Sequence, residues 1–261
     1  MVIQGKNISF SYDNKSFIDN LDIHIEKGKV TTIIGPNGSG KSTVLSLLCG
    51  MNKVKSGQVF INGRSLRKVK YKEIAKNISM VHQQNEVPGD LRVYDLVSFG
   101  RVPYKKAFET YSEDDESLIQ WAMEATGVSK YKETRVMELS GGERQRVFIA
   151  MALAQDTDIL FLDEPTTYLD IFHQIQILDI IKKLNKEKGI TVVMVLHDIN
   201  QALQYSDNII VMKDGEKIIS GESKKVLDGK VIEQVYGVKG AMTGIEEEGN
   251  YFIPLRNVEV Y

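Results

Sequence analysis

The chain has almost no cysteine and no long apolar run. Cys49 is the one cysteine among 261 residues, so no disulfide can form within the chain, and we expect a reducing compartment. The longest apolar runs, such as Ile190–Leu196, have the length of strands and fall well short of the ~20 residues that span a bilayer. The start, Met1–Phe10, shows no apolar leader segment. We therefore expect no disulfide-stapled domain and no integral membrane protein.

An excess of charge is also missing. Lys and Arg number 33 against 35 Asp and Glu, which gives a formal net charge of −2. A nucleic-acid-binding domain usually carries a strongly basic face, so we expect no nucleic-acid partner. The basic cluster Arg64–Lys72 is then best read as a solvated face. The chain is long enough to bury a core of its own.

The strongest chemical pattern is GPNGSGKST at residues 35–43. It follows the apolar run Val30–Ile34 and precedes the helix-like run Val44–Leu48, which is the order of a phosphate-binding P-loop. Glycines let successive backbone N–H groups turn inward around an anion, and the positive end of the helix points into the same nest. In such a loop Lys41 reaches the β- and γ-phosphates and Ser42 ligates Mg²⁺. We therefore predict a nucleoside triphosphate site that includes Gly35, Pro36, Asn37, Gly38, Ser39, Gly40, Lys41, Ser42 and Thr43.

Apolar runs and helical patterns alternate along most of the chain. Strand-like segments start near Val2 and Phe17, before the P-loop strand, and strands and helices alternate again from Ile159 to Met212. This rhythm predicts an α/β fold with a mostly parallel sheet and an N-terminal antiparallel β part. Lys213–Glu216, with Asp and Gly at its centre, predicts a two-residue hairpin turn.

Between residues 88 and 153 the strand-like runs vanish and helical periodicity takes over. We predict a single domain over 1–261. In it, 1–87 and 154–235 form the P-loop NTPase core, 88–153 form an inserted α-helical subdomain, and 236–261 form a C-terminal tail.

A second pair of motifs follows the helical segment. Leu139–Arg146 reads LSGGERQR and precedes a long helical run, and Ile159–Leu162 is an apolar strand that ends in Asp163 and Glu164. Ligands bind at the carboxyl ends of strands in α/β sheets, so both carboxylates are placed for chemistry. Asp163 can hold Mg²⁺ through water, and Glu164 can act as the base or water-orienting group for attack on the γ-phosphate.

At this point the sequence resembles the ATP-binding subunits of ABC transporters over residues 1–235. The resemblance rests on Walker A at 35–43, the signature at 139–146 and Walker B at 159–164, in the order of the family. One small departure is Glu143, which stands where many members have glutamine.

The resemblance also implies roles for single residues in the motifs that it matches. Tyr12 matches the aromatic residue that stacks on adenine, and Gln83 matches the Q-loop glutamine, a ligand of Mg²⁺ beside Ser42 and Asp163. Asp170 matches the D-loop and His197 the switch histidine. The implied catalytic residues are Glu164, His197, Gln83 and Lys41. His24, His82 and His173 match no motif, and we expect them to be structural.

The family further implies a head-to-tail dimer of two copies of the chain. ATP would lie between the P-loop of one copy and the signature of the other, where Ser140, Gly141 and Gly142 open a second anion site. Membrane permease subunits would be the direct partners and an extracytoplasmic substrate-binding protein an indirect one. The resemblance places the chain at the cytoplasmic face of the cell membrane.

One branch of the family imports iron–siderophore complexes, haem and vitamin B12. The stretch 88–104 resembles that branch in its Phe-Gly-Arg and Pro-Tyr ending, and so does 166–174. We therefore expect the ATPase of a ferric-siderophore importer, with haem, vitamin B12 and metal-ion importers as alternatives. Soluble ABC ATPases of DNA repair or translation form a different class, but they usually carry two cassettes or long heptad repeats, and this chain shows neither.

Overall fold

The structure, a computed structural model, describes residues 1–13, 15–87, 89–106, 109–246 and 249–258. The chain forms two compact units, Met1–Lys68 with Thr191–Tyr261, and Val69–Ile190. Pro88, at which the helical subdomain is predicted to begin, lies outside the described residues. The predicted division into core, helical subdomain and tail stays a prediction.

The first unit contains an antiparallel sheet in the order β2-β1-β4-β5. Ile3 at the start of β1 lies opposite Ile25 on one side and Ile61 on the other, and all three side chains are buried. Buried and exposed side chains alternate from Leu21 to Ile25 along β2, as the sequence predicts for a sheet with one solvated face. The strands are β1 (Ile3–Tyr12), β2 (Lys15–Ile25), β4 (Ser56–Ile61) and β5 (Arg64–Ser65).

A second group of strands in this unit is largely parallel. β3 (Val30–Ile34) pairs in parallel with β8 (Thr191–Val195) and with β9 (Asn208–Lys213). β10 (Glu216–Glu222) pairs antiparallel with β9 through a turn at Asp214 and Gly215, both with positive φ. Two positive φ values are typical of a type I′ turn, so the predicted two-residue hairpin is confirmed.

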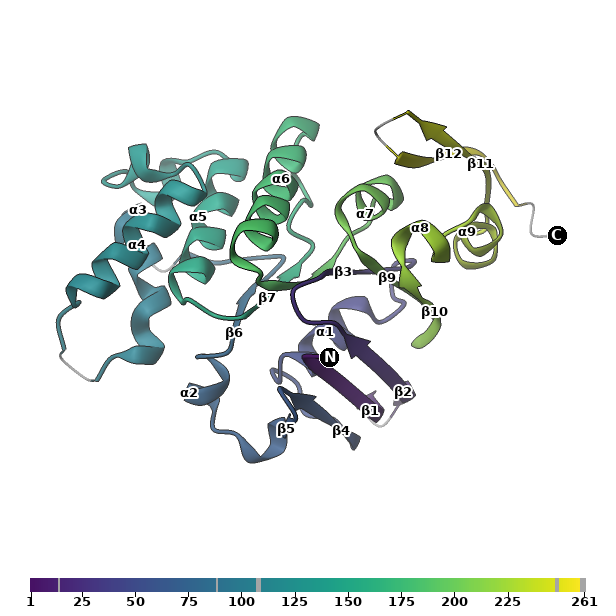
Figure 1. Ribbon diagram of the computed structural model, residues 1–261, viewed down its shortest axis with the longest axis horizontal. Coiled ribbons are helices and arrows are strands. Elements are labelled where there is room, and N and C mark those ends of the chain that lie inside the picture. Colours follow the sequence, from purple (N-terminus) through teal and green to yellow (C-terminus); the bar gives the residue numbers. More distant parts are fainter. Residues whose placement is uncertain (14, 88, 107–108, 247–248, 259–261) are drawn as a thin grey trace. The chain divides into compact units, whose positions relative to one another are not determined.

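Four helices and a terminal hairpin complete the first unit (Figure 1). The side-chain amide of Asn200 accepts from the backbone N–H of Phe252 at 2.7 Å and donates to the Phe252 carbonyl at 3.2 Å, which ties the hairpin to a helix. The sequence predicts only a strand-like tail here. The elements are α1 (Lys41–Leu48), α7 (Ile199–Tyr205), α8 (Ser223–Val226), α9 (Gly229–Tyr236), β11 (Val238–Ile245) and β12 (Gly249–Asn257).

The second unit combines two parallel strands with a group of helices. β6 (Ile78–Val81) pairs in parallel with β7 (Ile159–Asp163). Helices α3, α4 and α5 lie side by side and bury Val97, Ile119 and Phe148 among them (Figure 1). The helices are α2 (Tyr71–Ile74), α3 (Val93–Ser98), α4 (Glu113–Ala125), α5 (Gly141–Ala154) and α6 (Ile171–Lys188), with a 3₁₀ helix at Phe99–Tyr104.

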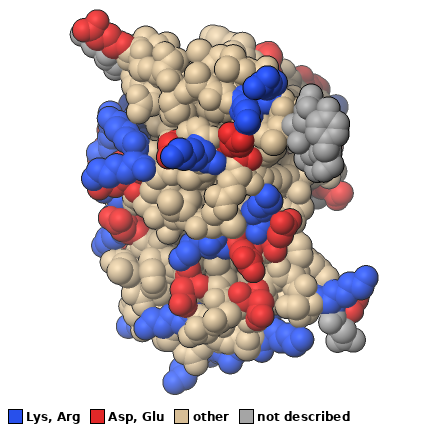
Figure 2. Space-filling model, turned by 90° about the vertical axis from the view of Figure 1, so that its right-hand side faces the viewer, with Lys and Arg blue, Asp and Glu red and all other residues tan. Residues whose placement is uncertain are grey.

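These elements confirm the predicted α/β fold with an antiparallel N-terminal part. Within the described ranges, no helix is both long and apolar enough to cross a bilayer. Figure 2 shows basic and acidic side chains interspersed on one face, in keeping with the formal net charge of −2.

Candidate active site

The P-loop joins β3 to α1 in the first unit. Gly35, Gly38 and Gly40 have φ values of 155°, 78° and 97°, a region that favours glycine, and Gly40 is the N-cap of α1. The Lys41 side chain is buried, and its Nζ donates to the carbonyl oxygens of Gly35 and Pro36 at 3.0 Å each. The ammonium group is therefore held against the loop that is predicted to take the phosphates.

Ser39 indicates that this loop takes an anionic ligand. Its backbone N–H donates to Pro36 at 3.2 Å, and its carbonyl accepts from Gly215 in the β9–β10 turn at 3.1 Å, so the loop is braced from both sides. The Ser39 hydroxyl is buried and has no hydrogen-bond partner among the described residues. Since buried polar groups are normally paired, a phosphate oxygen here would complete the loop.

Tyr12 lies at the end of β1, and its hydroxyl is 3.1 Å from the Thr43 hydroxyl of the P-loop. Its ring packs against Phe10 and Phe17, with centroids 4.8 Å and 5.6 Å away, while 50% of the residue stays exposed. The structure thus brings the predicted adenine-stacking residue next to the predicted phosphate loop.

His197 follows β8, the parallel neighbour of β3. Val195 pairs with Ile33, so His197 and the P-loop both leave the sheet at its carboxyl edge. The His197 side chain is exposed, and Asp198 caps the next helix by accepting from the Gln201 N–H at 2.8 Å. The first unit therefore gathers Tyr12, the P-loop and His197.

Glu164 stands directly after β7 in the second unit, with Asp163 as the last residue of the strand. Its Oε2 accepts a hydrogen bond from the Gln83 side-chain amide at 2.5 Å and another from the Thr167 hydroxyl at 3.0 Å. Glu164 has a φ of 50°, uncommon for a non-glycine residue. The carboxylate is thus oriented by two donors.

The signature residues open α5. The Ser140 hydroxyl accepts from the Glu143 N–H, and the Glu143 carboxylate accepts from the Ser140 N–H at 3.0 Å and the Ser140 hydroxyl at 2.7 Å, which is a capping box. Tyr131 also donates its hydroxyl to Glu143. The hydrogen bonds from Tyr131 and Ser140 lower the pKa of Glu143 to about 2.

This low pKa predicts a stability that depends on pH. The folded state holds Glu143 ionised well below its ordinary pKa of 4.5, so its contribution is complete above pH 4.5 and is lost as pH falls toward 2. We expect Glu143→Gln to lower the free energy of unfolding at pH 6 and the deficit to shrink at pH 3. Denaturant titrations at both pH values measure it, with Glu138→Gln at an exposed site as the control. A deficit of equal size at both pH values would refute this cause.

Gly142 lies in close contact with α6. A Cβ at this position would lie 2.5 Å from Cγ of His173, which real Cβ atoms do not tolerate. Asp170 caps α6 by accepting from the His173 N–H at 2.9 Å. The signature and the D-loop are therefore packed together through His173, a residue that the sequence leaves as structural.

Gly142→Ala should destabilise the protein by about 1–3 kcal/mol relative to Gly141→Ala, because only the former overpacks. A Cβ at Gly141 would lie 3.6 Å from Leu169, an ordinary contact, and both changes carry the same helix-propensity gain. Urea titrations of the two variants measure the difference. Equal unfolding free energies would show that His173 moves aside without cost.

Two residues of these clusters are absent from the sequence prediction, Tyr131 and Thr167. Tyr131 precedes Glu143 by twelve positions along the chain and sits in a 3₁₀ helix, so no spacing rule points to it. Thr167 is three residues after Glu164, a spacing at which a hydroxyl in a turn can reach back to the carboxylate.

Comparisons with known proteins identify the family of the chain. The family model of the ABC transporter matches residues 18–167. The iron(3+)-hydroxamate import ATP-binding protein FhuC of Bacillus subtilis (strain 168) is 43% identical over 90% of this chain and 88% of that protein. The ferric enterobactin transport ATP-binding protein FepC of Escherichia coli (strain K12) is 40% identical over 91% of this chain and 88% of that protein.

Solved structures share the fold. The dimeric ATP-binding cassette MJ0796, bound to ADP and Pi in a post-hydrolysis state, superposes with a TM-score of 0.73 at 31% identity and covers 85% of this chain and 98% of its own. The family match spans more than half of the chain, and its relatives align over nearly all of it. The chain therefore belongs to the ABC transporter family as an ATP-binding, ATP-hydrolysing domain.

Proposed function

We propose that this chain is the ATP-hydrolysing subunit that powers import of an iron(III)–siderophore complex through a membrane permease. The cargo rests on one observation, that relatives aligned over 90% or more of this chain are named for iron(3+)-hydroxamate and ferric enterobactin transport. The chemistry rests on the oriented carboxylate of Glu164 and on the P-loop.

ATP is the substrate that the first unit fits. Tyr12 would stack on adenine, and the P-loop N–H groups with Lys41 would hold the phosphates. Lys41 Nζ already donates hydrogen bonds to the Gly35 and Pro36 carbonyls, and it can donate to a β- or γ-phosphate oxygen instead.

The donor set also fits Mg²⁺, a hard cation that prefers oxygen ligands. The proposed ligands are the Ser42 hydroxyl, the Asp163 carboxylate and the Gln83 amide oxygen. The side-chain N–H of Gln83 donates to Glu164, so the amide oxygen of Gln83 is the atom that would face a cation. Bound Mg²⁺ would neutralise charge on the phosphates.

Hydrolysis is assigned to Glu164 as the general base or water-orienting residue. Gln83 and Thr167 orient the carboxylate through one of its oxygens, and the carboxylate would accept a proton from the attacking water. His197 would hold the γ-phosphate and this water.

A second copy of the chain is the proposed partner across ATP. One nest encloses only one side of a triphosphate, and Ser140, Gly141 and Gly142 at the start of α5 offer N–H groups and a helix dipole for the other side. Asp170 would couple the two sites. The MJ0796 cassette is dimeric, which supports a dimer of two copies of this chain.

The permease is the proposed direct membrane partner, at the cytoplasmic face of the cell membrane. Gln83 would report the state of the Mg²⁺ site to the helical segment that contacts the permease. A substrate-binding protein on the other side of the membrane would take part only indirectly.

The proposal is tested by purifying the tagged chain from detergent-solubilised membranes and identifying what accompanies it. A polytopic permease whose partner binding protein takes a ferric siderophore is the expected result. A permease for haem, vitamin B12 or a free metal ion would overturn the cargo, and ribosomes or DNA-processing proteins without any membrane protein would overturn the transport function.

Lys41→Ala is expected to weaken ATP binding by about 10- to 100-fold, because a charge-assisted hydrogen bond contributes ~1.5–3 kcal/mol. A titration with ATP measures the dissociation constant, and Lys53→Ala, which removes an exposed lysine twelve residues later, is the control. Unchanged ATP affinity in Lys41→Ala would contradict the assignment of the P-loop lysine.

A further inference from the structure

His173, in the first turn of α6, touches both a signature residue and the D-loop aspartate. A Cβ at Gly142 would lie 2.5, 2.8 and 2.9 Å from Cγ, Cδ2 and Cβ of His173, so the imidazole ring lies directly against the Gly142 backbone. The backbone N–H of His173 donates to Asp170 Oδ1 at 2.9 Å, and its Nε2 lies 4.0 Å from Asp170 Oδ2. One side chain therefore links two segments that are assigned to the ATP site.

The contact with His173 holds the first turn of α5 from outside. The capping box of Ser140 and Glu143 is made within that turn, so it shapes the turn without fixing it relative to another helix. Gly142 is buried and has no side chain, which lets the ring of His173 reach its backbone. The ring therefore sets where the N–H groups at the start of α5 lie relative to α6.

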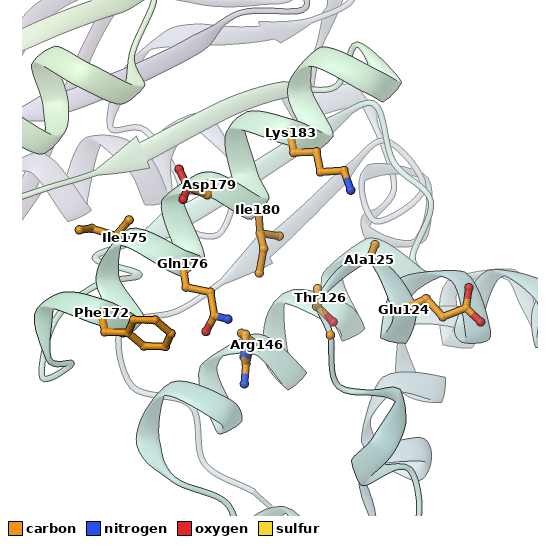
Figure 3. A pocket seen from close by; sticks show the side chains of 11 residues that line it. Glu124, Ala125, Thr126, Arg146, Phe172, Ile175, Gln176, Asp179, Ile180 and Lys183 are labelled. Carbon is orange, nitrogen blue, oxygen red and sulfur yellow. The ribbon is translucent and has the colours of Figure 1, made fainter. Parts of the chain in front are cut away.

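The two helices are less tightly packed one turn farther along. There a cavity of about 490 Å³ is lined by Arg146 of α5 and by Gln176 and Asp179 of α6 (Figure 3). Side chains that border empty space lack partner atoms on one side, so they resist a shift of one helix against the other only weakly. The close approach of His173 to Gly142 is thus the contact that sets the spacing between the first turns of α5 and α6.

We propose that His173 is a positioning residue for ATP hydrolysis in the dimer. Its ring holds the first turn of α5 so that the Gly141 and Gly142 N–H groups face the ATP on the P-loop of the other copy. Donors that are displaced by a fraction of an ångström stabilise a transition state less well. This inference rests on the proposed function, in which the signature of one copy completes the ATP site of the other. His173 itself touches no substrate, and it acts on the ATP of the partner copy.

Removal of the ring is the first test. His173→Ala should lower the turnover number for ATP by about 10- to 100-fold and leave the affinity for ATP within about twofold, because the P-loop and Tyr12 belong to the other unit. His24→Ala, the same change at an exposed site on β2, should behave as the wild type does. Wild-type turnover by a folded His173→Ala variant, or an equal loss of ATP affinity and turnover, would overturn the proposal.

Two further variants separate the ring from its nitrogens and guard against misfolding. His173→Phe keeps a flat ring on Gly142 and removes Nδ1, which is buried without a hydrogen-bond partner among the described residues, so it should stay folded and hydrolyse ATP within about threefold of the wild type. His173→Leu fills the helix surface without a flat ring and should lose turnover as His173→Ala does. Thermal unfolding midpoints show that each variant is folded. Loss of turnover in His173→Phe, or wild-type turnover in His173→Leu, would contradict the role of the ring.

A mixing experiment tests whether His173 acts on the partner copy. His173→Ala has an intact P-loop and Lys41→Ala an intact signature, so a mixed dimer contains one complete ATP site. An equal mixture should regain up to about a quarter of the wild-type turnover per chain, because half of the dimers are mixed and each of these has one complete site of two. Turnover no higher than the average of the two separate variants would overturn the proposal.

The dimer itself is measured separately, by sedimentation of Glu164→Gln with and without ATP. An ATP-dependent dimer is expected. If that dimer forms but the mixture regains no turnover, the proposed function stands and the role of His173 fails. If no dimer forms with ATP, the proposed partner and the role of His173 fail together.

Discussion

Glu164→Gln lowers the turnover number for ATP by about 10²- to 10⁴-fold and leaves the affinity for ATP within about threefold of the wild-type value. The glutamine amide has nearly the size of the carboxylate, so the backbone of residue 164 can keep its positive φ. The amide has no basic oxygen, however, that could take the proton of the attacking water. Single-turnover hydrolysis and an equilibrium ATP titration measure the two quantities separately.

A matched control accompanies this variant. Glu187→Gln makes the same chemical change at an exposed site near the end of α6, where Glu187 pairs with Lys183 at 3.9 Å. It should hydrolyse ATP at the wild-type rate. Wild-type turnover by Glu164→Gln would remove this residue from the catalytic role, and loss of ATP binding would point to misfolding of the segment after β7.

Arg101→Ala should destabilise the protein by about 3–5 kcal/mol, because it leaves a buried carboxylate without its partner. Arg101 Nε donates to Asp115 at 2.7 Å, and its Nη1 donates to the Ala154 carbonyl at 2.8 Å. The two side chains are 8% and 13% exposed. Burial raises the pKa of Asp115, but hydrogen bonds from Arg101 and Ser112 outweigh it and hold that pKa below its ordinary value.

An exposed ion pair in the same unit provides the comparison. Arg92 and Glu133 lie 2.5 Å apart, with side chains 58% and 69% exposed, so Arg92→Ala should cost at most about 1 kcal/mol. Guanidinium titrations of both variants measure the unfolding free energies. Similar small losses in both would show that water or local rearrangement replaces the Arg101 contacts.

Local order was largely predictable from the sequence. The strand Val30–Ile34 is buried at every residue, as its apolar run predicts. Helix α7 begins at Ile199 and ends at Tyr205, and apolar periodicity and turn residues in the sequence mark these bounds. Helix α6 runs to Lys188, beyond the apolar Leu184, because its last turn is polar and Gly189 ends it in the left-handed conformation.

Contacts between distant segments were not predictable. Gln83 and Glu164 are 81 positions apart, and only the family resemblance draws attention to both. Arg101 lies in the stretch that resembles the siderophore branch, yet in the structure it packs helices together. The pairing of Asn200 with the terminal hairpin and the cavity around Arg146 depend in the same way on tertiary packing, which leaves no local pattern.

Uptake of radioactive iron(III) bound to a siderophore tests the central claim most directly. It is measured in cells that lack this chain and that are complemented with the wild type or with Glu164→Gln, using hydroxamate and catecholate siderophores. We predict that uptake of at least one ferric siderophore is lost without the chain, restored by the wild type and not restored by Glu164→Gln. Unchanged uptake of every ferric siderophore in the deleted cells, or full restoration by Glu164→Gln, would contradict the account.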